Sequence, residues 1–269
     1  MLKLAVFGHP VSGSKSPAIH ARFAEAAGLD VDYRAIDCPG GQLAAALAEF
    51  RAEGGTGCNL TVPLKAEGLG LAESATHAAR DAGACNTLLL RDERWHADNT
   101  DGAGLLADFA RLDIAVRDRR VLIVGAGGAV AGILGPLLAE SPANVTLANR
   151  TIERAAALIG RFEGRDVDVA ATGLDGLDEH ARFDVLIQGT SLGHDGDVPD
   201  IRPAALAEDA VAYDLNYGQA HRPFAAWCAE HDIRSHDGRG MLIEQAARAF
   251  ELFTGTRPDT ASVHDLNSL

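Results

Sequence analysis

The sequence predicts an α/β protein built of two lobes, and three observations lead to this prediction. Short apolar segments alternate with amphipathic segments of helical spacing along almost the whole chain. A glycine-rich segment near the middle begins a second series of the same alternation. Polar clusters follow several apolar segments of the first series. We therefore expect an N-terminal α/β lobe with a mostly parallel sheet, a second α/β lobe with its own sheet, and a cleft between them.

The first lobe is expected to contain strands and helices in βαβ order. Ser16 and Pro17 predict a helix start, with Ser16 as the N-cap and Pro17 at the first helical position. Ile19, Phe23 and Ala27 recur every four residues and should face the core. We expect strands at residues 4–7, 31–36, 56–62 and 87–90, and a second helix over residues 43–50.

The second lobe should repeat this alternation. We expect strands at residues 120–124, 145–148, 167–170, 183–187 and 211–215, and helices over residues 128–140 and 151–161. Two last helices are expected over residues 240–253 and 260–266, and these should return to the first lobe, because the second sheet already has helices of its own. We place the joint just after Asp101. The first domain is then residues 1–101 and 238–269, and the second is residues 102–237.

The composition is that of a soluble globular protein. The 269 residues are 47% hydrophobic and 23% charged, and 24 basic against 38 acidic residues give a net charge of −14. This charge argues against nucleic acid or an anionic membrane as the main partner, because the summed field repels polyanions. A small anionic ligand in a local pocket remains compatible with it.

The ends and the cysteines predict a cytoplasmic location. The N-terminal apolar run reaches Pro10 too early for a signal peptide, and no segment approaches the ~18 consecutive apolar residues of a membrane span. The cysteines, Cys38, Cys58, Cys85 and Cys228, form no Cys-x-x-Cys pair, and no histidine cluster completes a zinc pattern. We expect buried free thiols in a reducing compartment and no metal site.

A glycine-rich turn joins the strand at residues 120–124 to the following helix. Its residues are Gly125, Ala126, Gly127, Gly128 and Ala129. Such a turn needs glycine because the chain bends sharply and its backbone must approach a pyrophosphate at the helix N-terminus. Val130 stands where a third glycine is usual, and an ordinary strand-to-helix turn is the alternative interpretation. The flanking strand and helix favour a Rossmann-like dinucleotide-binding lobe.

The end of the next strand indicates which dinucleotide binds. NAD-binding domains usually carry an acidic residue about 20 residues beyond the first glycine, where it binds the ribose hydroxyls. Here Asn149 is neutral, Arg150 is cationic, and Arg154 lies one helical turn further on, while Thr151 can donate its hydroxyl and cap the helix. Two guanidinium groups near a helix N-terminus can hold a 2′-phosphate. The pattern favours NADP over the alternative of two solvated arginines behind a capping threonine.

Two polar clusters in the first lobe suggest an anion site and a proton donor. Ser14 and Ser16 can both turn their hydroxyls toward one carboxylate near a helix N-terminus, although Ser16 can equally be only a cap. Asn59 and Thr61 share one face of an otherwise apolar strand. Lys65 follows at a strand-to-helix junction, where an amine in a cleft can exchange a proton and a solvated lysine is the alternative.

Two further clusters, residues 83–87 and 98–102, also follow strands. Each has a simpler interpretation as turn and cap chemistry, because Asp and Asn readily bond their own backbone. Four such clusters on one side of a sheet, in a chain with a cofactor turn, nevertheless point to one polar pocket.

Together these segments resemble the shikimate dehydrogenase family, in family order and over nearly the whole chain. The matching residues are 8–10, 14–20, 59–65, 83–87, 98–102, 125–129, 149–151, 214–217, 237–242 and 245–247. The resemblance implies the NADPH-dependent reduction of 3-dehydroshikimate to shikimate, in the pathway to chorismate and the aromatic amino acids. The implied partners are these small molecules, without nucleic acid or membrane, and the protein is expected to be a monomer or a homodimer.

The resemblance also implies roles for individual residues. Ser14 and Ser16 bind the substrate carboxylate. Its hydroxyls, carbonyl or ring are held by Asn59, Thr61, Asn86, Tyr217 and Gln245. The nicotinamide side is lined by Leu215, Gly238 and Met241. Lys65 and Asp101 are the catalytic pair, in which Lys65 stabilises the charge that develops on the ketone oxygen and supplies the proton, while Asp101 positions it.

Some positions depart from the family pattern, and three alternatives remain open. Gly13 and His77 stand where many members have histidine and an acidic residue, and residues 222–224 replace the commoner Thr-Pro. A quinate/shikimate dehydrogenase would have a broader substrate range, but the paired serines and the two arginines favour shikimate and NADP. A methylene-tetrahydrofolate dehydrogenase would lack the paired serines and Asp101. A catalytically silent NADP-binding or regulatory protein would not need Lys65 beside Asp101.

Overall fold

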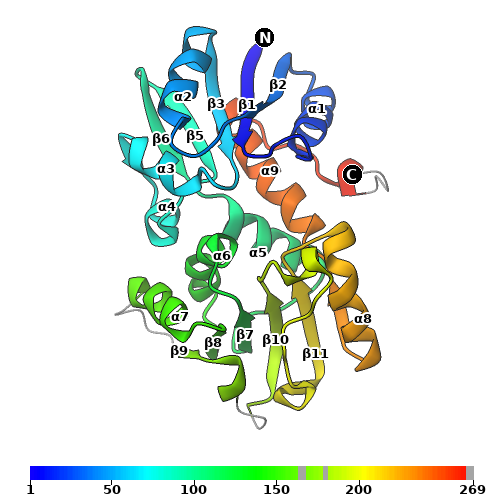
Figure 1. The fold of residues 1–269 in the computed structure, drawn as a ribbon. Coiled ribbons are helices and arrows are strands. Elements are labelled where there is room, and N and C mark those ends of the chain that lie inside the picture. The colour runs from blue at the N-terminus through cyan, green and yellow to red at the C-terminus, as the bar shows by residue number, and fades with distance from the viewer. Residues whose placement is uncertain (163–167, 178–180, 265–269) are drawn as a thin grey trace. The chain divides into compact units, whose positions relative to one another are not determined.

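The chain forms two compact α/β units in a computed structural model that describes residues 1–162, 168–177 and 181–264. The first unit is Met1–Leu105 with Leu242–Leu269, and the second is Leu106–Met241. The chain passes between the units within two helices, α5 (Asp101–Arg111) and α9 (Arg239–Thr254). Two sheets with mostly parallel pairing confirm the predicted fold class (Figure 1).

The first unit has a mixed sheet in the order β2-β1-β3-β5-β6-β4. Its strands are β1 (Leu2–Gly8), β2 (Val31–Asp37), β3 (Gly55–Leu60), β4 (Ser74–Ala75), β5 (Thr87–Arg91) and β6 (Arg94–Asp98). Strand β1 pairs in parallel with β2 and β3, and β4 with β6, whereas β5 runs antiparallel to both of its neighbours. The parallel strands β1 and β3 end at the same edge, which gathers the polar residues that follow them.

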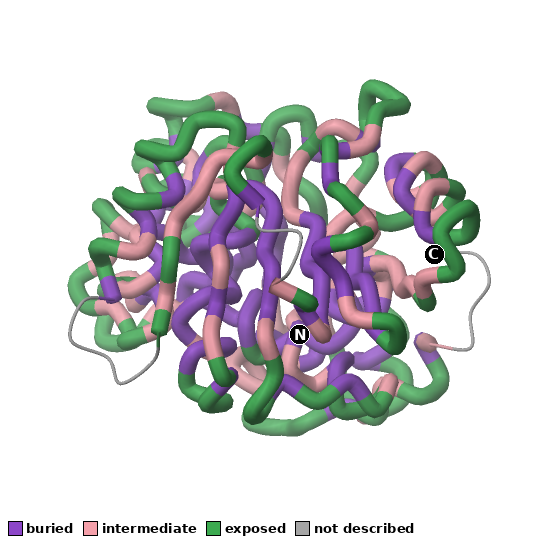
Figure 2. The backbone as a smooth tube through the Cα atoms, turned by 90° about the horizontal axis from the view of Figure 1, so that it is seen from below, coloured by how far each residue is buried: buried purple, intermediate pink, exposed green. Residues whose placement is uncertain are grey.

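Helices cover both faces of this sheet (Figure 1). They are α1 (Ser16–Ala27), α2 (Leu43–Ala52), α3 (Lys65–Leu71), α4 (His77–Ala82), α9 and α10 (Ala261–His264). One core cluster contains Phe7 with Leu43 and Phe50 of α2, and the other contains Phe23 of α1 with Phe250 of α9. Figure 2 shows the buried residues, in purple, concentrated along the strands.

The second unit has a parallel sheet in the order β12-β11-β10-β7-β8-β9. Its strands are β7 (Arg120–Val124), β8 (Asn144–Ala148), β9 (Val169–Thr172), β10 (Phe183–Gln188), β11 (Leu206–Asp214) and β12 (Arg234–His236). Its helices are α6 (Gly128–Ala139), α7 (Ile152–Ile159) and α8 (Arg222–Glu230). Single 3₁₀ turns lie at Gly160–Phe162, Leu174–Gly176, Leu192–Asp195, Pro203–Ala205 and Gly218–His221. This is the strand order of a Rossmann sheet. Successive strands are added to one side of β7 as β8 and β9 and then to its other side as β10, β11 and β12, so the order changes direction between β7 and β10.

Two local predictions differ from the structure. Lys15, in a helical conformation, precedes α1, and Ser16 is already its first residue, so the prediction of Ser16 as N-cap is wrong. The Ser14 hydroxyl instead accepts from the Ser16 amide at 3.3 Å. Strand β6 was missed because Asp92 and Glu93, with φ of 47° and 63°, make its hairpin turn without glycine. Val167 and residues 265–266 of the predicted elements lie outside the described residues.

The four cysteines are free and buried, as predicted. Among the residues that the structure describes, no helix combines the length and the apolar character needed to cross a lipid bilayer.

His20 is the most unusual core residue of the first unit. Its side chain is fully buried on α1, and both ring nitrogens lack hydrogen-bond partners among the described residues. It stacks on Tyr33, with ring centroids 4.0 Å apart and an interplanar angle of 13°. Burial lowers the pKa of His20 from 6.5 to about 3, because the charged imidazolium would lose its hydration.

This pKa predicts a specific loss of stability in acid. Below pH 6.5 the unfolded chain protonates His20, whereas the folded chain does so only near pH 3. The free energy of unfolding should therefore fall as the pH decreases from about 6.5 to about 3, by on the order of 5 kcal/mol from this group. His20→Phe should remove that component, which urea unfolding at pH 7 and pH 4.5 would measure. The exposed His77→Gln is the control, and equal acid sensitivity of His20→Phe and the wild-type protein would contradict the assignment.

Candidate functional site

Lys65 and Asp101 form an ion pair at the polar edge of the first sheet. Lys65 Nζ lies 2.6 Å from Asp101 Oδ2, and the two side chains are 22% and 8% exposed. Lys65 begins α3 just after β3 and Pro63, and Asp101 begins α5 just after β6. A carboxylate is favourable at a helix N-terminus, where the backbone carries partial positive charge. Two helix starts thus bring together the only two charges predicted to be catalytic.

Asn86 holds the second oxygen of this carboxylate. Its amide nitrogen donates to Asp101 Oδ1 at 2.8 Å, and its amide oxygen accepts from the Thr100 backbone amide at 2.9 Å and from the Thr87 hydroxyl at 2.8 Å. Gln245 on α9 joins the cluster, because its Oε1 lies 3.3 Å from Asn86 Nδ2. Each oxygen of Asp101 therefore has a partner, as a buried charge requires.

Asn59 extends this network along β3. It is 7% exposed. Its Nδ2 donates to the Asn86 carbonyl and to Thr87 Oγ1, both at 3.1 Å. Its Oδ1 accepts from the Tyr33 hydroxyl at 2.8 Å. One network within the first unit thus links five side chains directly or through shared partners: Asn59, Asn86, Lys65, Asp101 and Gln245.

The remaining predicted substrate residues have different surroundings. Ser14 and Ser16 are partly buried at the start of α1, where the Ser14 hydroxyl accepts from the Ser16 amide. Thr61 lies one residue beyond β3, and its amide donates to the Phe7 carbonyl at 2.9 Å. Tyr217 belongs to the second unit and is 37% exposed, so the structure does not unite it with the others.

Burial keeps the neutral proton donors of the first unit protonated. It raises the pKa of Tyr33 well above the usual phenol value, and the nearby Cys58 adds to the rise. It also raises the pKa of the Cys85 thiol to about 12, against the opposing charge of Lys65. These groups are therefore uncharged at neutral pH and do not compete with Asp101 for the lysine ammonium.

In the second unit, the glycine turn follows β7, where the order of the strands changes direction between β7 and β10. Gly125 has a φ of +111°, and a Cβ there would come within 2.9 Å of the Gly189 backbone at the end of β10. Gly189 is confined in turn, because its own Cβ would lie 2.4 Å from Val130 Cγ2. The missing third glycine is thus matched by a glycine on the neighbouring strand, and β7, β10 and α6 still pack closely.

The turn residues beyond Gly125 are accessible. Gly127 and Gly128 are exposed, and a Cβ on either would meet open space. Gly127 occupies the N-cap position of α6 in an extended conformation, which leaves the first helical amides directed outward. This is the geometry in which a helix N-terminus binds phosphate.

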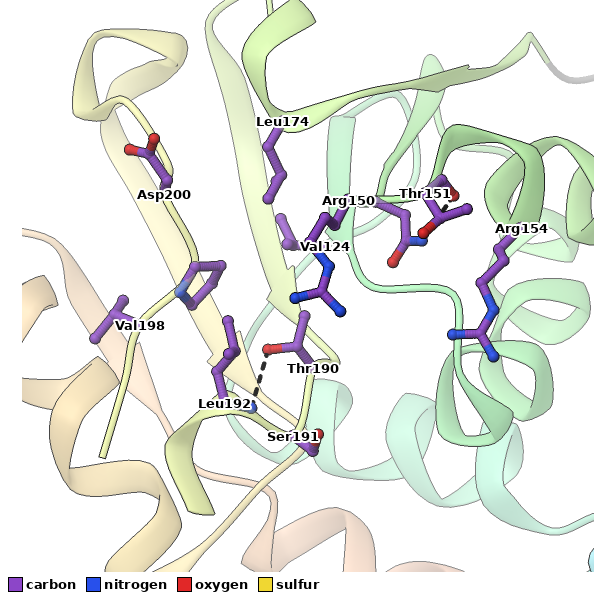
Figure 3. Close-up of a pocket in the computed structure, with 12 residues that line it drawn as sticks. Val124, Arg150, Thr151, Arg154, Leu174, Thr190, Ser191, Leu192, Val198 and Asp200 are labelled. Carbon is purple, nitrogen blue, oxygen red and sulfur yellow. Dashed lines mark hydrogen bonds between the residues drawn. The ribbon is translucent and has the colours of Figure 1, made fainter. Parts of the chain in front are cut away.

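A pocket of about 210 Å³ opens beside this turn (Figure 3). It is lined by Val124, Asn149, Arg150, Thr151, Arg154, Leu174, Thr190, Ser191, Leu192, Val198, Pro199 and Asp200. The Arg150 guanidinium points toward Thr190 (Figure 3). Thr151 is the N-cap residue of α7, but within the described contacts its hydroxyl accepts nothing from the first turn. The four residues predicted to select the dinucleotide therefore share one cavity.

Of the three predicted nicotinamide-side residues, Gly238 packs against the Leu215 backbone and Met241 contacts a buried tyrosine. A Cβ on Gly238 would lie 2.5 Å from the Leu215 carbonyl oxygen, so only glycine fits. The Met241 amide donates to the Tyr213 hydroxyl at 3.2 Å, and that hydroxyl donates to Asp108 Oδ2 at 2.7 Å.

The sequence did not reveal several residues of these sites. Tyr33 and Thr87 support Asn59 from neighbouring strands, and their residue types alone carry no signal for that role. Residues 190–192 line the pocket beside the glycine turn, and here a signal existed: they follow β10, whose carboxyl end lies beside that of β7 in a parallel sheet. Within the described part of the chain, no group of three or more His, Cys, Asp or Glu residues is placed to hold a metal ion.

Three family models match successive parts of the chain. The shikimate dehydrogenase substrate binding domain matches residues 6–88, shikimate / quinate 5-dehydrogenase matches residues 108–195, and the shikimate 5′-dehydrogenase C-terminal domain matches residues 238–266. A shikimate dehydrogenase (NADP(+)) of Alcanivorax borkumensis is 45% identical over 261 residues, which are 96% of this chain and 93% of the relative.

Solved structures agree with these matches. An Ael1 enzyme from Pseudomonas putida is 39% identical, with a TM-score of 0.91 over 98% of this chain and 97% of that one. The shikimate 5-dehydrogenase of Thermus thermophilus, solved in complex with NADP(H) and shikimate, is 32% identical, with a TM-score of 0.84 over 98% of each chain.

The fold and the site define a two-unit α/β oxidoreductase with a Rossmann sheet in one unit and a lysine–aspartate pair in the other. The chain belongs to the shikimate dehydrogenase family, which confirms the resemblance.

Proposed function

We propose that this protein catalyses the reversible, NADPH-dependent reduction of 3-dehydroshikimate to shikimate, a step toward chorismate and the aromatic amino acids. The observation that carries the proposal is the Lys65–Asp101 pair, held at 2.6 Å beside a set of neutral hydrogen-bonding groups. The 45% identity to a shikimate dehydrogenase (NADP(+)) supports the same assignment.

The neutral groups suit a polyhydroxylated acid. Ser14 and Ser16, at the start of α1, would bind the substrate carboxylate with hydroxyl donors and partial helix charge. Its hydroxyls, carbonyl or ring would be held by Asn59, Thr61, Asn86, Gln245 and Tyr217. Among the residues proposed to contact the substrate, these groups are neutral, and Lys65 would supply the positive charge for the reacting oxygen.

The chemistry requires one proton at the ketone oxygen. NADPH, when bound, supplies the hydride to the carbonyl carbon. The Lys65 ammonium would donate its proton to the oxygen as negative charge develops there, and Asp101 holds the amine in place. Lys65 is then neutral. In the reverse direction neutral Lys65 removes the proton of the substrate hydroxyl.

The second unit fits NADP by its own geometry. The turn at residues 125–129 would bind the pyrophosphate with the amides of its exposed residues 127–129, and Asn149, Arg150, Thr151 and Arg154 line the adjoining pocket with cationic and hydroxyl donors. Leu215, Gly238 and Met241 would line the nicotinamide side. We accordingly propose the first unit as the substrate-binding and catalytic domain and the second as the NADP-binding domain.

The net charge of −14 supports small-molecule partners and the absence of nucleic acid and anionic membrane partners. The cytoplasmic location and the monomeric or homodimeric state stay predictions.

A spectrophotometric assay tests the function directly. Shikimate with NADP⁺ should give rapid formation of NADPH, and quinate or NAD⁺ should be much poorer substrates at equal concentrations. Comparable rates with quinate would favour the broader quinate/shikimate dehydrogenase. Absence of turnover with every pair would refute the proposed activity.

Lys65→Ala should lower kcat by about 10²–10⁴-fold with little change in the KM for shikimate, because the lysine acts on charge that appears in the transition state. Asp101→Asn should also lose activity. Steady-state kinetics at saturating NADP⁺ would measure both, with Lys3→Ala, whose half-buried side chain bonds the Glu53 carbonyl, as a control for the loss of one lysine. An unchanged kcat in Lys65→Ala would exclude the catalytic role.

Arg150→Ala should raise the KM for NADPH by about 10-fold or more, because a charge-assisted contact to the 2′-phosphate is lost. The KM for NADH, which lacks that phosphate, should change little. The exposed Arg117→Ala in the same unit is the matched control. Equal effects of Arg150→Ala on both cofactors would rule out the phosphate clamp.

A further inference from the structure

We propose that Tyr33 is a positioning residue for substrate binding: its hydroxyl fixes Asn59 so that the free lone pair of Asn59 Oδ1 accepts a hydrogen bond from a substrate hydroxyl. The inference rests on the proposed function, because it concerns how the same site recognises its substrate. Tyr33 itself lies on β2, two strands away from the residue that it orients.

The sheet register brings the two side chains to one face. In the parallel ladder β2-β1-β3, Tyr33 aligns with Leu4 and Asn59 aligns with Val6. Leu4 and Val6 are two residues apart on β1 and point to the same face, so Tyr33 and Asn59 do as well. The two outer strands lie about 10 Å apart across β1. A tyrosine side chain crosses that span, and its hydroxyl reaches Asn59 Oδ1 at 2.8 Å.

Aromatic packing holds the phenol in this position. The ring of Tyr33 stacks on the fully buried His20 of α1, and His20 in turn contacts Phe23 and Phe250, with ring centroids 6.1 and 6.0 Å apart. The unpartnered nitrogens of His20 destabilise the fold, yet its flat ring fixes the plane of the phenol. Burial also keeps the hydroxyl protonated, and therefore a donor.

The hydrogen-bond inventory of Asn59 defines what it can still bind. Both protons of Nδ2 are taken by the Asn86 carbonyl and by Thr87 Oγ1. Because a backbone carbonyl can only accept, Nδ2 must face it, and Oδ1 must face Tyr33. The phenol fills one of the two lone pairs of Oδ1. What remains is a single acceptor, which matches a hydroxyl of the ligand and excludes a carbonyl or carboxylate oxygen.

Tyr33 also lies near the proposed carboxylate site. Ser16 counteracts part of the effect of burial on the Tyr33 pKa. Of the side chains proposed to bind substrate, the phenol thus has Asn59 as its hydrogen-bond partner and Ser16 as a neighbour. Removal of the Tyr33 hydroxyl would leave Asn59 Oδ1 buried without its donor, and the side chain would be held through Nδ2 alone, which loosens the orientation of the remaining acceptor.

Tyr33→Phe tests the proposal, because it removes only the hydroxyl and keeps the ring on His20. The KM for shikimate should rise about 10-fold, as for the loss of one oriented hydrogen bond, while the KM for NADP⁺ stays within about two-fold. The thermal midpoint should change little. In an Asn59→Ala background, the same Tyr33→Phe change should have almost no further effect on the KM for shikimate.

Thr254→Val is the matched control. It removes a hydroxyl that bonds the Phe250 carbonyl at 2.8 Å, on α9 and roughly 14 Å along the helix from Gln245. It should leave both KM values unchanged. An unchanged KM for shikimate in Tyr33→Phe would overturn the inference, as would a parallel rise of both KM values with a lower thermal midpoint, which is the signature of a purely structural role. Wild-type protein that fails to oxidise shikimate would instead refute the proposed function.

Discussion

The carboxylate of Asp101 imposes the main constraint on the first unit. A charge that is only 8% exposed must be paired and hydrogen-bonded, since desolvation otherwise favours its neutral form. Lys65 takes one oxygen and Asn86 the other. Asn86 is itself held by Thr87 and Thr100, so the loops after β3 and β6 and the start of the antiparallel strand β5 must converge on one point. The order of this mixed sheet is what allows that convergence.

The same network explains how specificity and catalysis share one set of residues. The groups that orient Asp101 also surround the position where a substrate would bind, so their donors and acceptors are mostly committed to one another. Asn59 keeps one acceptor, and the Lys65 ammonium keeps protons beyond the one that it gives to Asp101. Most hydrogen-bonding groups of this network are already paired. Few remain for a ligand, and each of these is defined as a donor or as an acceptor.

The second unit has to attract an anionic ligand, and it has backbone amides and arginines for this purpose. A protein of net charge −14 must attract an anionic dinucleotide locally. In the proposed function, the exposed residues 127–129 of the turn would do so with backbone amides, and Arg150 and Arg154 would add positive charge where they line the pocket. Close packing around Gly125 and Gly189 keeps that turn at the reversal point of the sheet, where dinucleotides bind in Rossmann folds.

The sequence by itself determined the α/β class and the glycine turn, because these depend on periodicity and on a motif that is contiguous in the chain, whereas the pairing of Lys65 with Asp101 was implied by the resemblance to the family. It failed at Ser16, where the helix start is one residue earlier than the cap rule expects, and at β6, whose turn lacks glycine. Only the tertiary structure could reveal Tyr33 beside Asn59, Gly189 against Val130, and residues 190–192 in the nucleotide pocket. Those contacts join strands far apart in sequence, and strand order and register, which local patterns do not encode, decide which side chains meet.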